Sequence, residues 1–130
     1  MRVTVSATGA ATPDVVWDRY VRPARWPTWS PYIRRVDCTD EVLQAGTTGQ
    51  VHGPTGLVGD FRVLVVEPAE RTWSWRVRIR HLKMQLDLLH DVQQVPEGGT
   101  SSTLRIDGLV PVALSYAPIA QWSLTQLVRP

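Results

Sequence analysis

The sequence predicts one α+β domain, spanning residues 1–130, in which a curved antiparallel sheet packs around a C-terminal helix. Three observations lead to this fold class. The elements follow in the order of one strand, two short helical segments, six successive strands and a last helix. The segment Thr72–Arg80 alternates strictly with a period of two, and the residues after Pro111 change to a helical period. Only the last helix is long enough to cover the apolar face of such a sheet.

The first thirty residues predict a strand followed by two short helical segments. Valines alternate with polar residues over Arg2–Ser6, as in a half-buried strand. Thr12 is a favourable helix cap and Pro13 a favourable first helical residue, so a helix is expected over Asp14 to about Val21. Three prolines then restrict the chain to a tight helix or turn around Ala24–Trp29.

Six further strands are predicted between clusters of Gly, Pro, Asp and Glu. They are placed at about Tyr32–Thr39, Thr48–His52, Leu57–Glu67, Thr72–Arg80, Lys83–Gln94 and Ser101–Leu109. The segment Glu97–Thr100 contains two adjacent glycines and predicts a hairpin turn between the last two strands.

The chain after Pro111 is predicted to be helical. Small and apolar residues fall close to one helical stripe, formed by Val112, Tyr116, Ile119, Ala120, Ser123 and Leu127. Pro118 lies inside this segment and is expected to break the helix or to delay its start. A bent sheet that grips a helix rarely closes completely, so a ligand pocket is expected in the gap between them.

Composition excludes several classes of function. Fourteen basic residues against twelve acidic ones give a net charge of only +2, which is too small to indicate a nucleic-acid partner. The single cysteine, Cys38, cannot form an internal disulfide, no signal peptide is evident, and no apolar run is long enough for a transmembrane segment. A cytoplasmic location is therefore expected.

The histidines are far apart and no nucleotide-binding glycine pattern exists, so neither a metal nor another cofactor is expected.

The segment Thr72–Arg80 places two indoles and two branched aliphatic side chains on one face and arginines on the other. Two tryptophans on an inner wall favour a ligand pocket, although tryptophans also serve simply to fill a core. Side chains of the same inward parity are the candidate ligand contacts. They are Trp29, Phe61, Trp73, Trp75, Met84, Leu86, Leu88, Ile119 and Ser123. The outward arginines are interpreted as a solvated face, interleaved with aspartates.

His90 is the polar member of an otherwise apolar row in its strand and is the first candidate for catalysis. An imidazole can act as acid or base near neutral pH, or donate to a carbonyl, but it can also be a hydrogen-bonded core residue. Tyr32 and Tyr116 are the other catalytic candidates, because each carries a hydroxyl at the expected opening. A phenol there could orient a ketone, or only bridge a wet rim and an apolar interior.

Several motifs together resemble one superfamily over nearly the whole chain. These motifs are Trp17, Arg25–Tyr32, Gly46–Gly49, Trp73–Trp75 and Tyr116–Pro118. They resemble the polyketide cyclase/dehydrase and lipid-transfer branch of the START and Bet v 1-like (SRPBCC) superfamily. The resemblance implies the helix-grip fold and a cavity for lipids, sterols, polyketides or plant hormones. The motifs are signatures of the fold and carry no chemistry of their own.

Three functions follow from this resemblance as expectations. The first is a module that binds a hydrophobic or aromatic small molecule without changing it. The second is a polyketide cyclase, aromatase or dehydratase that uses His90 with Tyr32 or Tyr116. The third is an interaction protein whose cavity is vestigial. The terminal helix is shorter than in many relatives, so one end of the cavity is expected to be more open or to be closed by a second subunit. The protein is accordingly expected to be a monomer or a homodimer.

Overall fold

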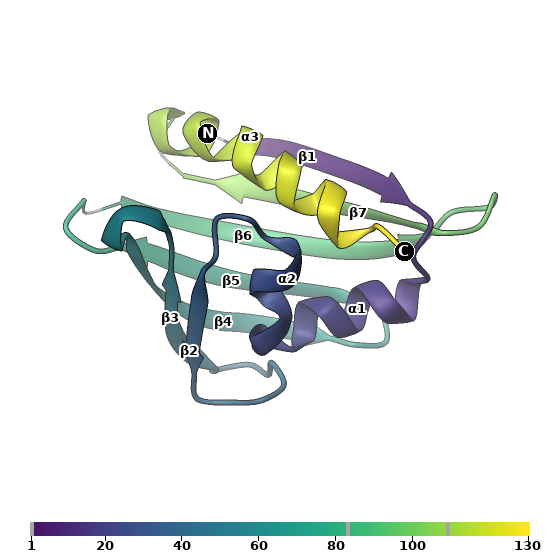
Figure 1. Cartoon of the computed structure of the whole chain (residues 1–130), viewed down its shortest axis with the longest axis horizontal. Helices are drawn as coiled ribbons and strands as arrows, with labels where there is room; N and C mark the ends of the chain where they lie inside the picture. Colours follow the sequence, from purple (N-terminus) through teal and green to yellow (C-terminus); the bar gives the residue numbers. More distant parts are fainter. Residues whose placement is uncertain (1, 83, 109) are drawn as a thin grey trace.

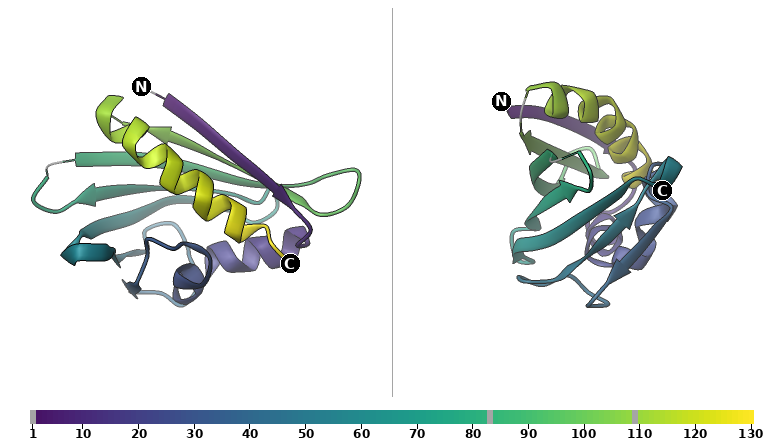
Figure 2. Two further views of the ribbon diagram at one scale, coloured as in Figure 1. Left: turned by 45° about the horizontal axis from the view of Figure 1, so that its top comes forward. Right: turned by 90° about the vertical axis from the view of Figure 1, so that its left-hand side faces the viewer.

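The computed structural model describes residues 2–82, 84–108 and 110–130, with the side chains of 110–112 and 114 excepted. Its main feature is a curved, antiparallel, seven-stranded sheet in the order β1-β7-β6-β5-β4-β3-β2. Helix α3 lies across the concave face, and α1 and α2 cover one end of that face (Figure 1). The two further views show how strongly the sheet bends around the helix (Figure 2). The predicted α+β helix-grip fold is confirmed.

The elements lie close to their predicted positions. The strands are β1 (Arg2–Gly9), β2 (Arg35–Cys38), β3 (Thr48–His52), β4 (Val58–Glu67), β5 (Thr72–Ile79), β6 (Met84–Gln94) and β7 (Thr100–Asp107). The helices are α1 (Pro13–Val21), α2 (Trp26–Trp29) and α3 (Val110–Leu127), with short 3-10 turns η1 (Pro23–Arg25) and η2 (Pro54–Gly56). Lys83 and Leu109, two predicted strand ends, lie outside the described residues, as does the side chain of Val112.

The strand predicted at Tyr32–Thr39 is shorter in the structure. Pairing with β3 begins only at Arg35, because Tyr32 and its neighbours form a turn in which Ile33 N donates to Ser30 O at 3.0 Å. This turn follows α2 directly. Tyr32 is therefore held at the rim of the concave face instead of in the ladder of the sheet.

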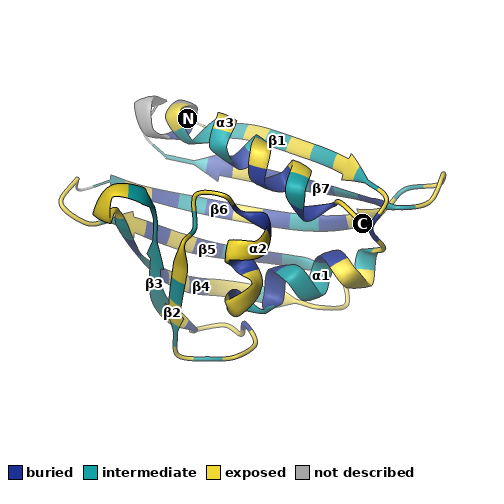
Figure 3. Ribbon diagram, viewed as in Figure 1, coloured by how far each residue is buried: buried dark blue, intermediate teal, exposed yellow. Residues whose placement is uncertain are grey.

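The alternation predicted for β5 sorts its side chains between the two faces of the sheet. Trp73, Trp75 and Val77 are buried on the concave face, whereas Arg76 and Arg78 are exposed on the convex face (Figure 3). Arg76 Nε donates to Asp87 Oδ1 on β6 at 2.7 Å. Exposed pairs of this kind contribute little to stability. The convex face is thus a solvated, charge-balanced surface, and the hydrophobic content of the strand is directed to the interior.

A β-bulge corrects the orientation predicted for one residue of β4. Simple alternation along the strand would place Phe61, Val63 and Val65 on the same inner wall, but the pairing with β5 shifts between Val63 and Val65. After the shift, Val65 is 45% exposed and Val66 packs against the core instead. Leu82 likewise departs from simple alternation, which would place it on the inner face beside Met84. It is 51% exposed in the turn that precedes β6, where strand alternation does not apply.

Helix α3 is continuous over 18 residues, so the predicted break near Pro118 is wrong. Proline removes one helical hydrogen bond and usually costs about 3 kcal/mol inside a helix. Packing compensates here, because the buried face of α3 places Ala120, Leu124 and Leu127 against the core while Pro118 is exposed. The helix end is also held from α1. Arg19 Nη1 donates to Leu127 O at 2.6 Å and so satisfies a terminal carbonyl.

Helix α1 begins as predicted, at the cap formed by Thr12. The Thr12 hydroxyl accepts from Val15 N at 3.4 Å. From this helix the buried Tyr20 reaches the sheet, and its hydroxyl lies 2.6 Å from Ser102 Oγ. Ser102 uses its own hydrogen to bond Asp91 O at 2.8 Å, so Tyr20 is the donor in the first bond. This chain of bonds fixes α1 over one end of the concave face.

Candidate functional site

Two adjoining hollows lie between the concave face and α3. The larger one, called the outer chamber, has a volume of about 160 Å³. The smaller one, called the inner niche, has a volume of about 20 Å³. Both are lined by Ser30, Ile33, Trp75 and Tyr116, so these four residues form the boundary between them. The outer chamber reaches the surface, and the inner niche lies deeper, beside the aromatic side chains of the core.

The outer chamber is walled almost entirely by apolar side chains. Val77 on β5 together with Leu86 and Leu88 on β6 forms its floor, and Ile119 on α3 forms part of its roof. A dry cavity of about 150 Å³ with such a lining is known to accept one benzene ring. The outer chamber is therefore the right size for a single ring with a short substituent.

The mouth of the outer chamber is formed by loops that carry exposed apolar groups. Tyr32 and Leu57 line the chamber and are 40% and 41% exposed, respectively. Gly59 allows β4 to pass close to the floor, since a Cβ there would lie 2.9 Å from Val77 Cγ1. Gly56 in η2 has φ of 75°, a conformation that favours glycine. The segment Gly53–Gly56 is thus a tight turn at the opening.

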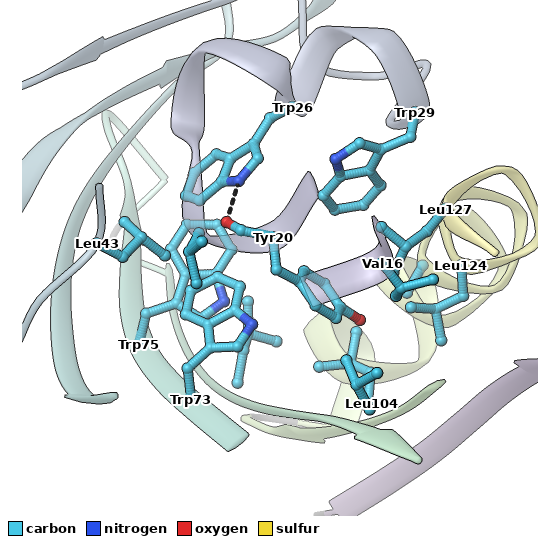
Figure 4. Packing of buried hydrophobic residues seen from close by; sticks show 14 of the residues in the cluster. Val16, Tyr20, Trp26, Trp29, Leu43, Trp73, Trp75, Leu104, Leu124 and Leu127 are labelled. Carbon is cyan, nitrogen blue, oxygen red and sulfur yellow. Dashed lines mark hydrogen bonds between the residues drawn. The ribbon is translucent and has the colours of Figure 1, made fainter. Parts of the chain in front are cut away.

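The inner niche lies beside an aromatic cluster, defined by Tyr20, Trp26, Trp29, Phe61, Trp73, Trp75 and His90. Figure 4 shows Tyr20 with Trp26, Trp29, Trp73 and Trp75. Trp26 stacks on Trp73 with 5.8 Å between ring centroids, and its Nε1 donates to Tyr20 O at 2.8 Å. Trp29 Nε1 donates to Arg19 O at 3.2 Å. The proline-rich turn of α2 is therefore anchored by its two tryptophans, as expected.

His90 is buried in this cluster and is neutral. Its ring stacks on Trp73 with 4.4 Å between centroids and an angle of 8°. Its Nε2 accepts a hydrogen bond from Trp75 Nε1 at 2.9 Å, and burial lowers the pKa of the imidazole to about 3. Because Nε2 is the acceptor, the single hydrogen of the neutral ring is on Nδ1. Nδ1 has no hydrogen-bond partner among the described residues.

Of the three catalytic candidates, the structure brings two together. His90 and Tyr116 both line the inner niche, while Tyr32 lines only the outer chamber, near its mouth. Burial raises the pKa of Tyr116 to about 12, so its phenol is a neutral donor at physiological pH. The Nε2 lone pair of His90 is already engaged by Trp75. The described lining of the niche consequently offers donors and contains no free base.

The candidate ligand contacts divide between the two hollows. Leu86, Leu88 and Ile119 line the outer chamber, Trp29, Trp73 and Ser123 line the inner niche, and Trp75 lines both. Phe61 and Met84 line neither hollow. Phe61 packs instead against Trp26 and Trp75, with ring centroids 5.5 and 5.4 Å away.

Sequence reasoning missed some of the lining residues. Ser30 is buried and its hydroxyl lies 3.1 Å from that of Ser123 on α3. It sits in an irregular turn, where no periodic pattern indicates which way a side chain points. Val51 was also missed, although the alternation of β3 could have indicated it.

The described residues contain no cluster of potential metal ligands, and none of the described helices is long and apolar enough to cross a membrane.

A curved antiparallel sheet that grips a long C-terminal helix and leaves a cavity between them defines the START and Bet v 1-like (SRPBCC) class of fold. The sequence agrees at a finer level. The chain belongs to the family described as polyketide cyclase / dehydrase and lipid transport, whose family model matches residues 1–130.

Solved structures share the fold at low sequence identity. The protein XoxI from Bacillus cereus is 20% identical with a TM-score of 0.78, over 98% of this chain and 92% of that one. The major latex-like protein 151 from Panax ginseng is 13% identical with a TM-score of 0.80, over 98% and 94%. Ara h 8.0201 is 10% identical with a TM-score of 0.73, over 97% and 94%. No curated protein sequence matches the chain.

Proposed function

We propose that this protein binds a small hydrophobic molecule in the outer chamber without altering it chemically. One observation carries this proposal: a chamber of about 160 Å³, lined by apolar side chains of β5, β6 and α3, opens to the surface. Pockets with these features are the usual binding sites of apolar ligands. The size favours a ligand with one aromatic or alicyclic ring over a polyketide with several fused rings.

A polyketide cyclase or dehydratase is the second candidate, because His90 and Tyr116 share the inner niche. Enolisation of a ketone needs a proton acceptor beside the reacting carbon. The described residues that line the two hollows include no Asp, Glu or Lys. The basic nitrogen of His90, Nε2, already accepts a hydrogen bond from Trp75. These features support binding over acid–base catalysis. The volume of the chamber also argues against a vestigial cavity.

Native mass spectrometry of the protein purified from its own host tests the proposal. We expect an excess mass of a small apolar molecule that is released unchanged on denaturation. The purified protein should also bind one-ring aromatic molecules in a calorimetric titration, with a single site. Absence of any bound mass together with no binding across a panel of such molecules would refute the proposal. Conversion of a reactive poly-ketone that is lost in His90→Gln would establish the enzyme instead.

A further inference from the structure

We propose that the inner niche recognises a carbonyl oxygen, so that the ligand is a compact ring-bearing ketone, aldehyde or ester. The ring would fill the outer chamber and the oxygen would enter the niche. This inference rests on the proposed function and adds the chemical class of the ligand. It follows from an imbalance of hydrogen-bond donors and acceptors in the niche.

The first donor is His90 Nδ1–H. His90 is only 5% exposed, lines the niche, and has no hydrogen-bond partner for Nδ1 among the described residues. A buried donor without a partner is destabilising, so such groups are rare in proteins and usually have a reason. A ligand acceptor would remove this cost. The bond from Trp75 Nε1 to Nε2 fixes the tautomer and keeps Nδ1 protonated.

Hydroxyl groups supply further donors. Ser30 Oγ and Ser123 Oγ are 3.1 Å apart, and a bond between two hydroxyls uses one of their two hydrogens. The other hydrogen remains available to a guest. Tyr116 stands where the niche meets the outer chamber, so a carbonyl attached to a ring in the chamber would pass beside its phenol.

The niche suits one neutral oxygen. A volume of about 20 Å³ holds a group the size of a single water. Its described lining contains neither an arginine nor a lysine, and His90 is neutral, so a carboxylate would lose its hydration without gaining a counter-ion. A carbonyl oxygen accepts two hydrogen bonds and costs far less to desolvate.

The ring of Tyr20 is the competing acceptor. Its centroid lies 4.9 Å from that of His90 and 5.5 Å from that of Trp73, whose Nε1 also lacks a hydrogen-bond partner among the described residues. Figure 4 shows Trp73 beside the Tyr20 ring. Contacts of an N–H with an aromatic face are weaker than a bond to a carbonyl oxygen. A ligand carbonyl would therefore still gain from the His90 donor.

Three one-ring probes test this inference by calorimetric titration: acetophenone, ethylbenzene and benzoate. The first two have the same ring and the same substituent length and differ in the carbonyl. We expect acetophenone to bind about tenfold more tightly than ethylbenzene, as one or two neutral hydrogen bonds allow. Benzoate should not bind at pH 7. The infrared carbonyl stretch of bound, ¹³C-labelled acetophenone should lie below its position in hexane.

Variants then identify which side chains donate to the carbonyl. For each variant the measured quantity is the ratio of the affinities for acetophenone and ethylbenzene, because this ratio cancels general changes in packing. His90→Leu removes the imidazole donor, and Tyr116→Phe removes only a hydroxyl. Each should reduce the ketone preference about threefold and move the carbonyl stretch toward its value in hexane. His90→Asn keeps an N–H near the position of Nδ1 and should restore part of the preference. Thr125→Ala, on the exposed side of α3, is the matched control and should leave the preference unchanged.

The outcomes separate the two proposals. Binding of ethylbenzene and acetophenone with equal affinity, or a carbonyl stretch equal to that in hexane, would overturn the carbonyl inference and leave the binding function intact. Binding of neither probe, together with no bound mass in the protein from its own host and no binding across the wider panel, would overturn both. A ketone preference that survives both His90→Leu and Tyr116→Phe would contradict the assignment of the niche.

Discussion

The two ends of the concave face are built from the same strands but are used differently. At the filled end, α1 and α2 cover the sheet and insert Tyr20 and Trp26 against Trp73. At the hollow end, Val77 of the same β5 strand and Leu86 of β6 line a chamber that α3, the η2 turn and the turn after α2 border without filling it. Both ends are apolar. The cavity therefore results from what covers the sheet, and not from the side chains that the sheet itself presents.

This difference explains why side-chain alternation alone does not locate a ligand site. The row on β5 is continuous from Trp73 to Val77, yet only its second half borders the larger hollow. The filled end provides rigidity and places donors beside the hollow end. The ligand-binding capacity arises at the boundary, at Trp75 and Tyr116, which line both hollows.

Removal of the indole of Trp26 should lower the stability of the protein more than any other change considered, because it would leave a cavity at the filled end. Trp26 is almost fully buried and bonds Tyr20 O. Trp26→Ala is expected to lower the free energy of unfolding by about 3–5 kcal/mol, measured by urea denaturation followed by circular dichroism. Trp122, which is 50% exposed on α3, is the control, and Trp122→Ala should cost less than about 1 kcal/mol. Similar losses in the two variants would contradict the division of the two ends.

Protonation of His90 should weaken the filled end as the pH falls. Its folded pKa of about 3 lies below the value of about 6.5 in an unfolded chain, so the unfolded state binds the proton first. The contribution of the neutral His90 to the free energy of unfolding is fully present above pH 6.5. It is lost as the pH falls from 6.5 to 3, at up to about 1.4 kcal/mol per pH unit. His90→Gln should remove this slope between pH 7 and 5.

The same titration contains its own control. Burial raises the pKa of the neighbouring Asp91 carboxyl, an effect of opposite sign that is present in both proteins. The difference between the wild type and His90→Gln therefore isolates the imidazole. Parallel stability curves for the two proteins would show that His90 is not buried as a neutral group.

Filling the hollow end should abolish binding at little cost to stability. Ile119 lines the roof of the outer chamber from α3. Ile119→Phe places extra carbon atoms in the chamber and is expected to weaken the binding of ethylbenzene at least tenfold, about 1.4 kcal/mol. The free energy of unfolding should change by less than about 1.5 kcal/mol, because the added volume enters an existing hollow. Ile119→Leu conserves volume and serves as the control. Undiminished binding in Ile119→Phe would place the ligand elsewhere.

The smallest effect is expected at the mouth. Tyr32 lines the chamber but is 40% exposed, so a bond from its hydroxyl to a ligand would compete with water. Tyr32→Phe should change the affinity for acetophenone less than about twofold. A tenfold loss, by contrast, would place the phenol in direct contact with the ligand and would return Tyr32 to the candidate catalytic residues.

The order of strands and helices could be predicted from the sequence, because the strand period is clear in β5 and the helical period is clear in α3. Trp73, Trp75 and His90 were all predicted to face inward, and β6 keeps one register through His90. Predictions failed where geometry depends on the partner strand. Val65 is exposed because of a bulge that its own alternation does not reveal.

The candidate site was less predictable than the fold. Phe61 has the inward parity that was predicted, but Trp26 covers it, and the cover comes from a segment about thirty residues earlier in the chain. Ser30 lies in a turn without periodicity. The tautomer of His90 depends on Trp75, which lies on the neighbouring strand two residues along from Trp73, the direct partner of His90. Such relations require coordinates, since they depend on distances between segments remote in sequence.

The indole arrangement gives the protein an intrinsic optical signal. Trp75 borders both hollows, and its excited state is sensitive to any molecule that displaces solvent or approaches its ring. Emission from Trp26, Trp29 and Trp73 should be blue-shifted by their dry surroundings, while Trp122 contributes light of longer wavelength. Replacement of Trp122 by Phe would remove much of the solvent-exposed background. Ligand entry could then be followed by fluorescence, without any attached dye.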